Sequence, residues 1–279
     1  METSLSKPTV IVIGGPNGAG KSTLARTLLP PDVEFINADE IAKSLKAGSE
    51  EGAGNVDVAA GRLALQRMNQ LASENRSFAV ETTLSSRKLA TRIHRLQADG
   101  YEFNLYDICV GSPELSVNRV ADRVRMGGHN ITEDVIRRRY ARGIQNFFET
   151  YSKIANTWFM YDNNILGKAH IVAERHGIAE LVVHDLKVWQ TLNLQLEEIR
   201  QMEKSTSDSM YVADVADAPL DPKYTYKPPS PEAKRVEALF RLAVRQAMLE
   251  HKTAGMPMAI WQDDKVIWIP ADELVIEDE

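Results

Sequence analysis

A strand, a glycine-rich loop and a helix follow one another near the N-terminal end of the sequence, and this segment constrains the fold most strongly. The run from Thr9 to Ile13 consists only of β-branched residues, which is typical of a strand buried inside a parallel sheet. The run breaks at Gly14, and a helical pattern covers about residues 20–29 before two prolines stop it. This order predicts a sheet edge at which backbone N–H groups face a ligand.

The loop reads Gly-Pro-Asn-Gly-Ala-Gly-Lys-Ser from Gly15 to Ser22 and matches the pattern G-x-x-x-x-G-K-[ST]. Glycines let the backbone curl around phosphates, a lysine reaches the outer phosphoryl oxygens, and the last hydroxyl is a ligand for Mg²⁺. We therefore expect ATP or GTP here, with Mg²⁺ bound by Ser22. The residues predicted to bind the nucleotide are Gly15, Asn17, Gly18, Ala19, Gly20, Lys21, Ser22 and Thr23.

Apolar runs alternate with amphipathic helical patterns as far as residue 204. Strands are expected at about 33–37, 77–81, 101–110, 158–161 and 169–173, and helices at about 56–71, 87–98 and 185–202. Such alternation is typical of α/β proteins with a parallel sheet covered by helices on both faces. Together with the loop, it predicts a nucleotide-kinase-like fold of the P-loop NTPase type.

Acidic residues stand at the ends of two expected strands. Asp39 follows the strand at 33–37, and Glu81 ends the strand at 77–81, with Thr83 shortly after it. Ligands of open parallel sheets bind at the carboxyl ends of the strands, so Asp39 is a candidate base and Glu81 a candidate for substrate or metal-bound water. A solvated Asp39 capping a helix, and a structural hydrogen-bonding role for Glu81, are the alternatives.

The stretch of about 113–151 predicts a helical lid. Helices are expected at about 114–126 and 133–151, and Gly127-Gly128-His129-Asn130 joins them. Seven arginines fall between residues 119 and 142, and most of them are expected on a solvated face. One or two could close over the phosphates, as arginines do in kinases. The candidates are Arg119, Arg123 and Arg138, and His129 is a further candidate for a phosphate contact.

Composition argues against several other classes of function. The formal net charge is -6 and the pI is about 5.6, which disfavours a general nucleic-acid or membrane-surface binder. No apolar run reaches the roughly 18 residues of a membrane helix, and a cytoplasmic location is expected. Cys109 lies in an apolar stretch and is expected to be a buried hydrophobe. His94, His129 and His170 lack the spacing of zinc ligands.

A change of composition divides the chain. Residues 1–204 form the predicted kinase domain, and residues 205–229, rich in proline and serine, are expected to be a linker. Residues 230–279 are expected to form a small α+β extension, with a helix at about 231–250. A hairpin follows in it, with strands at 258–261 and 266–269 turned by Asp263-Asp264.

Four ordered segments resemble the zeta toxin family of P-loop kinases. They are GGPNGAGKST, INADEIA, VETTLS and RVADRVRMGGHNITEDVIRRRY, within about residues 8–165. The resemblance implies phosphorylation of a sugar hydroxyl of UDP-N-acetylglucosamine and restraint by an antitoxin. It also implies Lys21 on the phosphates and Asp39 as base. Glu81, Thr83 and, on a weaker match, Arg62 would contact substrate. The lid of the family carries two arginines that contact the phosphates. Arg123 or Arg119 fits the first of these two positions, and the second falls near His129.

Two other functions stay open at this point, together with the role of the extension. A housekeeping sugar or nucleoside kinase would share the scaffold, and a nucleotide-sensing regulatory module would bind without appreciable turnover. Residues 230–279 are hypothesised to act as an antitoxin in cis, with the helix at 231–250 near the nucleotide cleft. A packing extension or a dimerisation arm is the alternative.

Overall fold

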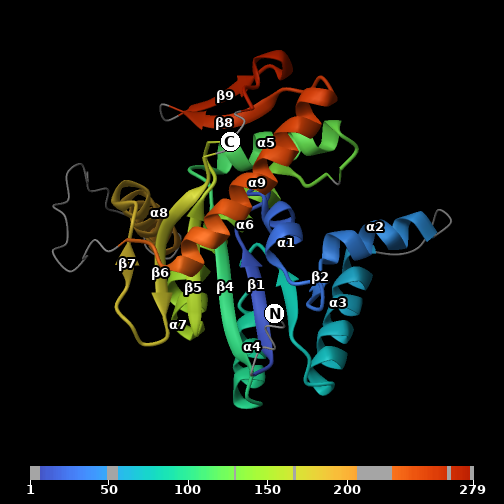
Figure 1. The fold of residues 1–279 in the computed structure, drawn as a ribbon, viewed down its shortest axis with the longest axis vertical. Coiled ribbons are helices and arrows are strands. Elements are labelled where there is room, and N and C mark those ends of the chain that lie inside the picture. The colour runs from blue at the N-terminus through green and yellow to red at the C-terminus, as the bar shows by residue number, and fades with distance from the viewer. Residues whose placement is uncertain are drawn as a thin grey trace.

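The computed structural model describes residues 7–48, 56–128, 130–165, 168–205, 228–262 and 265–276. Its centre is a seven-stranded sheet in the order β2-β3-β1-β4-β5-β6-β7 (Figure 1). The strands are β1 (Thr9–Gly14), β2 (Glu34–Ile36), β3 (Phe78–Glu81), β4 (Glu102–Cys109), β5 (Thr157–Asp162), β6 (His170–His176) and β7 (Val182–Val183). The expected α/β fold, with its mostly parallel sheet, is confirmed.

One edge of the sheet departs from the parallel arrangement that the sequence pattern predicts. The pairs β2–β3, β3–β1, β1–β4 and β4–β5 are parallel, whereas β5–β6 and β6–β7 are antiparallel. The reason is the short connection between Asp162 and His170, which has no room for the crossover that a parallel pair requires.

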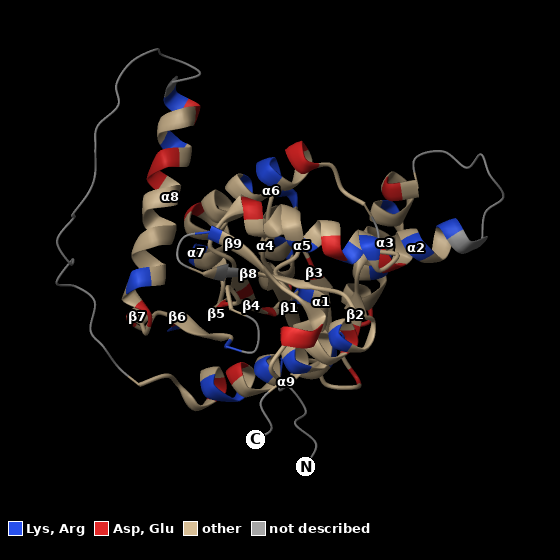
Figure 2. Ribbon diagram, turned by 90° about the horizontal axis from the view of Figure 1, so that it is seen from above, with Lys and Arg blue, Asp and Glu red and all other residues tan. Residues whose placement is uncertain are grey.

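Alternate residues of β1 build two cores, one on each face of the sheet. Val10 and Val12 belong to a cluster that includes Phe103 and Trp158, while Ile11 and Ile13 face the other way. Helices α1 (Lys21–Leu28) and α9 (Pro231–Thr253) cover the second face. The first face is covered by α3 (Val56–Ser73), α4 (Lys88–Ala98), the end of α6 (Glu133–Asn146) and α8 (Leu186–Ser205) (Figure 2).

The region expected to be a lid begins with α5 (Pro113–Arg125), whose cap is the Ser112 hydroxyl accepting from the N–H of Leu115. A single helix was expected at 133–151. Instead α6 ends at Asn146 and continues as the π-helix η1 (Phe147–Tyr151) and α7 (Ser152–Ile154). The wider turn buries both Phe147 and Tyr151 in the core. The expected elements also did not include α2 (Ala38–Gly48), a helix that directly follows β2.

Helix α9 is an integral part of the second core. Phe240 is fully buried there, together with Val236 and Val244. Its start is fixed by Glu174 of β6, which accepts hydrogen bonds from the N–H (2.8 Å) and hydroxyl (2.5 Å) of Ser230. After α9 come the hairpin of β8 (Met258–Gln262) and β9 (Lys265–Ile269) and the short helix η2 (Ala271–Glu273). The expected turn Asp263-Asp264 and most of the expected linker (206–227) lie outside the described residues.

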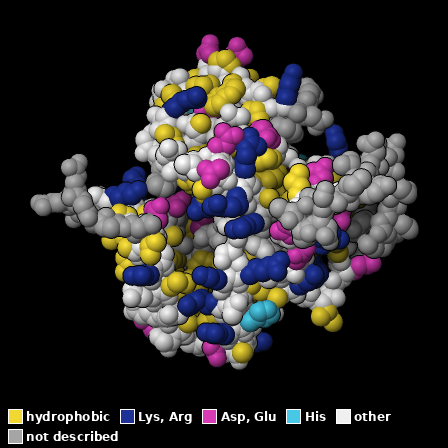
Figure 3. Space-filling model, turned by 180° about the vertical axis from the view of Figure 1, so that it is seen from behind, with side chains coloured by type: hydrophobic (Ala, Val, Ile, Leu, Met, Phe, Trp, Pro, Cys, Tyr) yellow, Lys and Arg dark blue, Asp and Glu magenta, His cyan; other side chains and the backbone are white. Residues whose placement is uncertain are grey.

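Within the described ranges, no helix has both the length and the apolar character needed to cross a membrane. On the face opposite α9, dark-blue Lys and Arg side chains run down the middle with Asp and Glu side chains among and above them (Figure 3).

Candidate active site

The glycine-rich loop connects β1 to α1 and has the backbone that only glycine adopts readily. Gly15 has φ 132° and Gly20 has φ 96°. A Cβ on Gly15 would collide with the carbonyl oxygen of Ile108 in the neighbouring strand β4. The loop is therefore pressed against the sheet, and its N–H groups are available at the start of α1.

Lys21 is buried at the base of this loop. Its Nζ donates to the carbonyl oxygen of Pro16 at 2.8 Å and lies 3.7 Å from Oε1 of Glu81. Burial lowers the pKa of Lys21, while the negative charges of Glu81 and Asp39 act against this effect. The loop thus holds a desolvated ammonium group with a carboxylate beside it.

Glu81, at the end of β3, is contacted by α1 and by Asn37, which lies between β2 and α2. Its Oε2 accepts hydrogen bonds from the Ser22 hydroxyl at 2.6 Å and from Nδ2 of Asn37 at 2.9 Å. Two oxygen-bearing groups therefore meet directly below the phosphate loop. Mg²⁺ in kinase sites takes oxygen ligands from one or two side chains and completes its shell with phosphates and water. Ser22 and Glu81 fit this requirement, and no larger His/Cys/Asp/Glu cluster suited to a metal exists among the described residues.

Asn37 connects Glu81 to the position of Asp39. Its Oδ1 accepts from the N–H of Asp39 at 2.9 Å and from the N–H of Glu40 at 3.4 Å, so it caps α2. Asp39 is exposed in the first turn of that helix, and its negative charge favours a higher pKa of Lys21. Sequence reasoning did not single out Asn37, although an asparagine two residues before an acid is a recognisable signal for a helix start.

The other predicted site residues divide into two groups. Arg123 lines the cleft above the loop, and its charge acts on Lys21. Arg119 also lines the cleft, but its Nε and Nη2 donate to the carbonyl oxygens of Ala259 and Asn164. Arg62 on α3 and Arg138 on α6 are exposed and lie outside the residues lining the cleft. His129 lies outside the described residues.

The cleft has a volume of about 590 Å³ and brings together the loop, the lid and the C-terminal segment. The loop and α1 contribute Gly18, Gly20, Lys21, Ser22, Thr23 and Arg26, α2 contributes Lys43, and the ends of β3 and β5 contribute Glu81 and Asn163. From the lid it takes Arg119, Asp122, Arg123, Met126, Gly127 and Gly128. Its remaining wall is Val244, Ala247, Glu250, His251, Met258 and Ala259.

The turn after Glu81 is strained, and a hydrogen bond from α6 holds it in place. Leu84 has φ 54°, an unusual value for a residue with a branched side chain. Its carbonyl accepts from Nδ2 of Asn146 at 2.7 Å, and its N–H donates to the Thr82 hydroxyl. Thr83 pairs its hydroxyl with that of Ser85 at 2.9 Å. Strain of this kind clusters at ligand sites, so the turn is a candidate part of the acceptor site.

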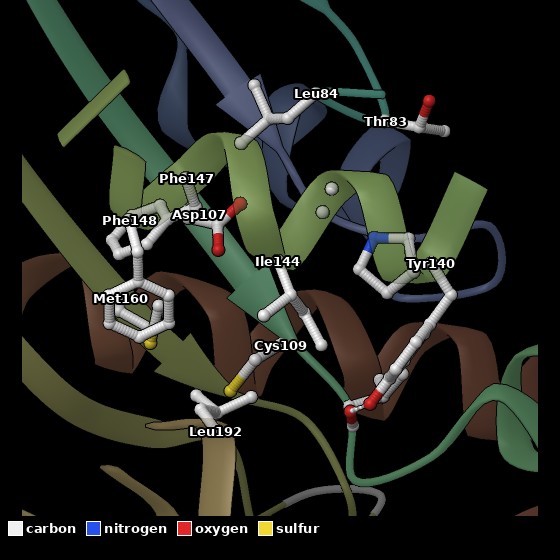
Figure 4. Close-up of a pocket in the computed structure, with 14 residues that line it drawn as sticks. Thr83, Leu84, Asp107, Cys109, Tyr140, Ile144, Phe147, Phe148, Met160 and Leu192 are labelled. Atoms are coloured by element: carbon white, nitrogen blue, oxygen red, sulfur yellow. Dashed lines mark hydrogen bonds between the residues drawn. The ribbon is translucent and has the colours of Figure 1, made fainter. Parts of the chain in front are cut away.

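A second small cavity, of about 20 Å³, lies behind the loop and is distinct from the cleft. Thr83 lines it, and Figure 4 shows the Asp107 carboxylate among the side chains of Leu84, Ile144 and Phe147. Burial raises the pKa of Asp107 to about 7, although the charge of Lys21 acts in the opposite direction. Sequence reasoning missed this group. Cys109 also lines this cavity. It is a free cysteine and is buried, as expected.

The fold and the loop place the chain in the class of P-loop kinases. The family model described as zeta toxin matches residues 1–165, and the chain belongs to that family. It is therefore an ATP-dependent kinase by family, and a phosphotransferase.

A protein of Haemophilus influenzae described as uncharacterized is 32% identical over 127 residues, covering 45% of this chain and 88% of that protein. The AvrRxo1-ORF1:-ORF2 structure with ATP is similar in fold. Its TM-score is 0.57 at 17% identity, over 86% of this chain and 76% of that one. The structure from the PezAT chromosomal toxin-antitoxin system of Streptococcus pneumoniae has a TM-score of 0.46 at 19% identity, over 72% and 90% of the two chains.

Proposed function

We propose that this kinase transfers the γ-phosphoryl group of ATP to a sugar hydroxyl of a nucleotide-linked amino sugar, with UDP-N-acetylglucosamine as the expected acceptor. The observation that carries the proposal is the double role of Asn37, which joins the carboxylate of Glu81 to the helical turn that bears Asp39. The negative charge of Asp39, in the first turn of α2, acts against the lowering of the pKa of Lys21 in the phosphate loop, which supports Asp39 as the base. The family resemblance supports the choice of acceptor.

The roles of the residues follow from this arrangement. The loop N–H groups and Lys21 would bind the triphosphate, and Arg123 would add positive charge from the lid. The acceptor oxygen forms a bond to the γ-phosphorus, the bond to the β–γ bridging oxygen breaks, and ADP leaves. Asp39 would take the proton of the acceptor hydroxyl. When bound by Ser22 and Glu81, Mg²⁺ would neutralise charge on the phosphoryl oxygens.

The test is to incubate the full chain with ATP and a panel of UDP-sugars, free sugars and nucleosides, and to follow the masses of all acceptors. The expected result is one added phosphate on UDP-N-acetylglucosamine, lost in Asp39→Asn while ATP binding is kept. Phosphorylation of a free sugar or nucleoside alone would instead favour a housekeeping kinase. ATP binding with no acceptor modified would favour a nucleotide-sensing module.

An antitoxin partner is part of the proposal because the family resemblance implies one, and a cytoplasmic location remains a prediction. Restraint in cis by residues 230–279 also remains a prediction. Its support is the position of α9 and β8 on the cleft. It predicts that a chain ended at about residue 205 is more active, and more toxic in cells, than the full chain.

A further inference from the structure

We propose that α9 and β8 form the wall of the ATP site against which the nucleobase packs, so that the C-terminal segment completes the nucleotide site. The inference rests on the proposed use of ATP at the phosphate loop. It assigns a ligand contact to Val244, Ala247 and Met258, which follow the predicted kinase domain in sequence.

The first observation is the direct packing of α9 against the phosphate loop. The nearest ring atoms of Phe240 would lie 3.4 and 3.6 Å from a Cβ on Gly20. The same loop is held from the sheet side by Asn163, whose Nδ2 donates to the carbonyl oxygen of Ala19 at 2.9 Å. The crossing of α9 over α1 is visible in Figure 1. The helix therefore fixes the shape of the loop as well as one side of the cleft.

The second observation is that the hairpin is fastened to the lid helix α5. Nε of Arg119 donates to the carbonyl oxygen of Ala259 at 3.3 Å, and the N–H of Ala259 bonds to the carboxylate of Asp122. The guanidinium of Arg125 lies 5.1 Å from the centre of the Trp268 ring. Lid and C-terminal segment thus form one continuous wall around the outer part of the cleft.

The third observation is the difference in chemistry between two parts of the cleft lining. Near the loop its lining is charged, with Lys21, Glu81 and Arg123. On the wall formed by α9 and β8, the lining is mainly small or apolar. It consists of Val244, Ala247, Met258 and Ala259, with Glu250 and His251 as the polar members. Sites for small ligands measure roughly 300–1,000 Å³ and combine an apolar lining with a few polar groups. A triphosphate beside the charged residues and a purine against the apolar wall match this division of the lining.

The arrangement differs from that of a segment that plugs the site. A plug would send its large side chains into the space beside Lys21. Here the largest apolar side chain of the wall helix, Phe240, is fully buried in the core, and a cleft of about 590 Å³ remains. The wall and restraint in cis predict opposite results for a chain ended at about residue 205: the wall predicts weaker ATP binding, and restraint predicts higher activity. Because removing α9 also exposes the core of α1 and β1, truncation alone does not separate lost contacts from lost folding.

The decisive experiment therefore uses point variants of the full chain. Ala247→Trp fills the outer cleft from a half-buried position, and Gln246→Trp adds the same side chain at the exposed neighbouring position, outside the cleft lining. Dissociation constants for ATP and for inorganic tripolyphosphate are measured by calorimetry, with melting curves to verify folding. A probe without a base separates contacts to the base from contacts to the phosphates.

The expected result for Ala247→Trp is an ATP affinity at least about tenfold weaker, with tripolyphosphate affinity unchanged and Gln246→Trp like the parent. An unchanged or stronger ATP affinity in Ala247→Trp would overturn the proposal. If Ala247→Trp melts at a lower temperature than the parent, His251→Ala is measured in its place. The expected result is then a changed ratio of ATP affinity to GTP affinity, and an unchanged ratio would overturn the proposal. Failure of the proposed function looks different, because ATP would then bind without transfer to any acceptor.

Discussion

The hydroxyl of Ser22 and the carboxylate of Glu81 form a hydrogen bond of 2.6 Å although they are separated by 59 positions in the chain. The contact exists because β3 lies next to β1, so that the ends of both strands reach the same edge. It places a negative charge where a divalent cation would join the protein to the phosphates.

Glu81→Gln is expected to lower kcat by about 100-fold or more, since it removes charge from the proposed cation site. The concentration of Mg²⁺ needed for half-maximal rate should rise as well. Initial rates over a Mg²⁺ titration measure both effects. The exposed Glu74→Gln is the matched control. An unchanged Mg²⁺ dependence would show that Glu81 serves only as a structural acceptor.

Asn37→Ala is expected to reduce kcat by about 10- to 100-fold while leaving ATP affinity within a few-fold, because Asp39 loses its anchor but the phosphate loop does not. Loss of the helix cap should also lower the free energy of unfolding by about 1 kcal/mol. Asp39→Asn provides the comparison, since it removes the proposed base and keeps the cap. Should Asn37→Ala weaken ATP binding as strongly as it weakens turnover, the anchoring role is wrong.

The part of the site that sequence could predict is the part fixed by local pattern. Lys21 and Ser22 follow from the loop motif, and Glu81 follows because the ends of parallel strands converge at one edge. Asn37 was missed because residues 33–37 were assigned entirely to a strand, whereas β2 ends at Ile36 and Asn37 caps a helix. Its amide also contacts Glu81, a partner that only the sheet order brings near.

Tertiary packing explains what sequence could not show. Asp107 lies in a strand whose pattern does not reveal that its carboxylate lines a small cavity behind the loop. The antiparallel β6 depends on the length of one connection. For α9, the sequence suggested a helix near the nucleotide cleft, but it did not show that the buried stripe of Phe240 and Val244 packs on α1 and the sheet.

Asp107→Asn is expected to change how stability depends on pH. The pKa of Asp107 is raised by burial from 3.8 to about 7, so the folded state binds its proton more tightly than the unfolded state. Stability from this group is therefore present at low pH and is lost as the pH rises to about 7. Between about pH 4 and pH 8, the free energy of unfolding of the variant should therefore rise relative to that of the parent by on the order of 1 kcal/mol or more.

Denaturant unfolding of both proteins at the two pH values measures this difference. The exposed Asp99→Asn serves as control. A gap between variant and parent that is equal at both pH values would contradict the assignment.

Gly20→Ala is expected to abolish ATP binding, whereas Gly100→Ala should not. Both glycines have positive φ, 96° and 93° respectively, so both substitutions impose a backbone cost of about 1–2 kcal/mol. Only at Gly20 would the new Cβ also meet neighbours, Nδ2 of Asn163 at 3.0 Å and the ring of Phe240 at 3.4 Å. Melting curves and ATP calorimetry on the pair separate strain from contact. Equal ATP affinities in the two variants would contradict tight packing of the loop.

Phe240→Ala is expected to lower the free energy of unfolding by about 3–5 kcal/mol, because the ring is fully buried between α9 and the loop. Leu242→Ala on the same helix, where the side chain is 56% exposed, should change it by less than about 0.5 kcal/mol. Urea titrations of the two variants give the comparison. Similar losses in both would mean that α9 is not packed as described.

The shared core of Phe240, Leu24 and Ile13 also sets an order of events during synthesis. The strand and loop that bear Lys21 leave the ribosome early, but the helix that covers them is made only after most of the chain. A nascent chain still lacking α9 has an uncovered apolar face over α1 and an unsupported loop. If α9 forms the proposed wall of the nucleotide site, that site is complete only when translation of the chain is almost finished.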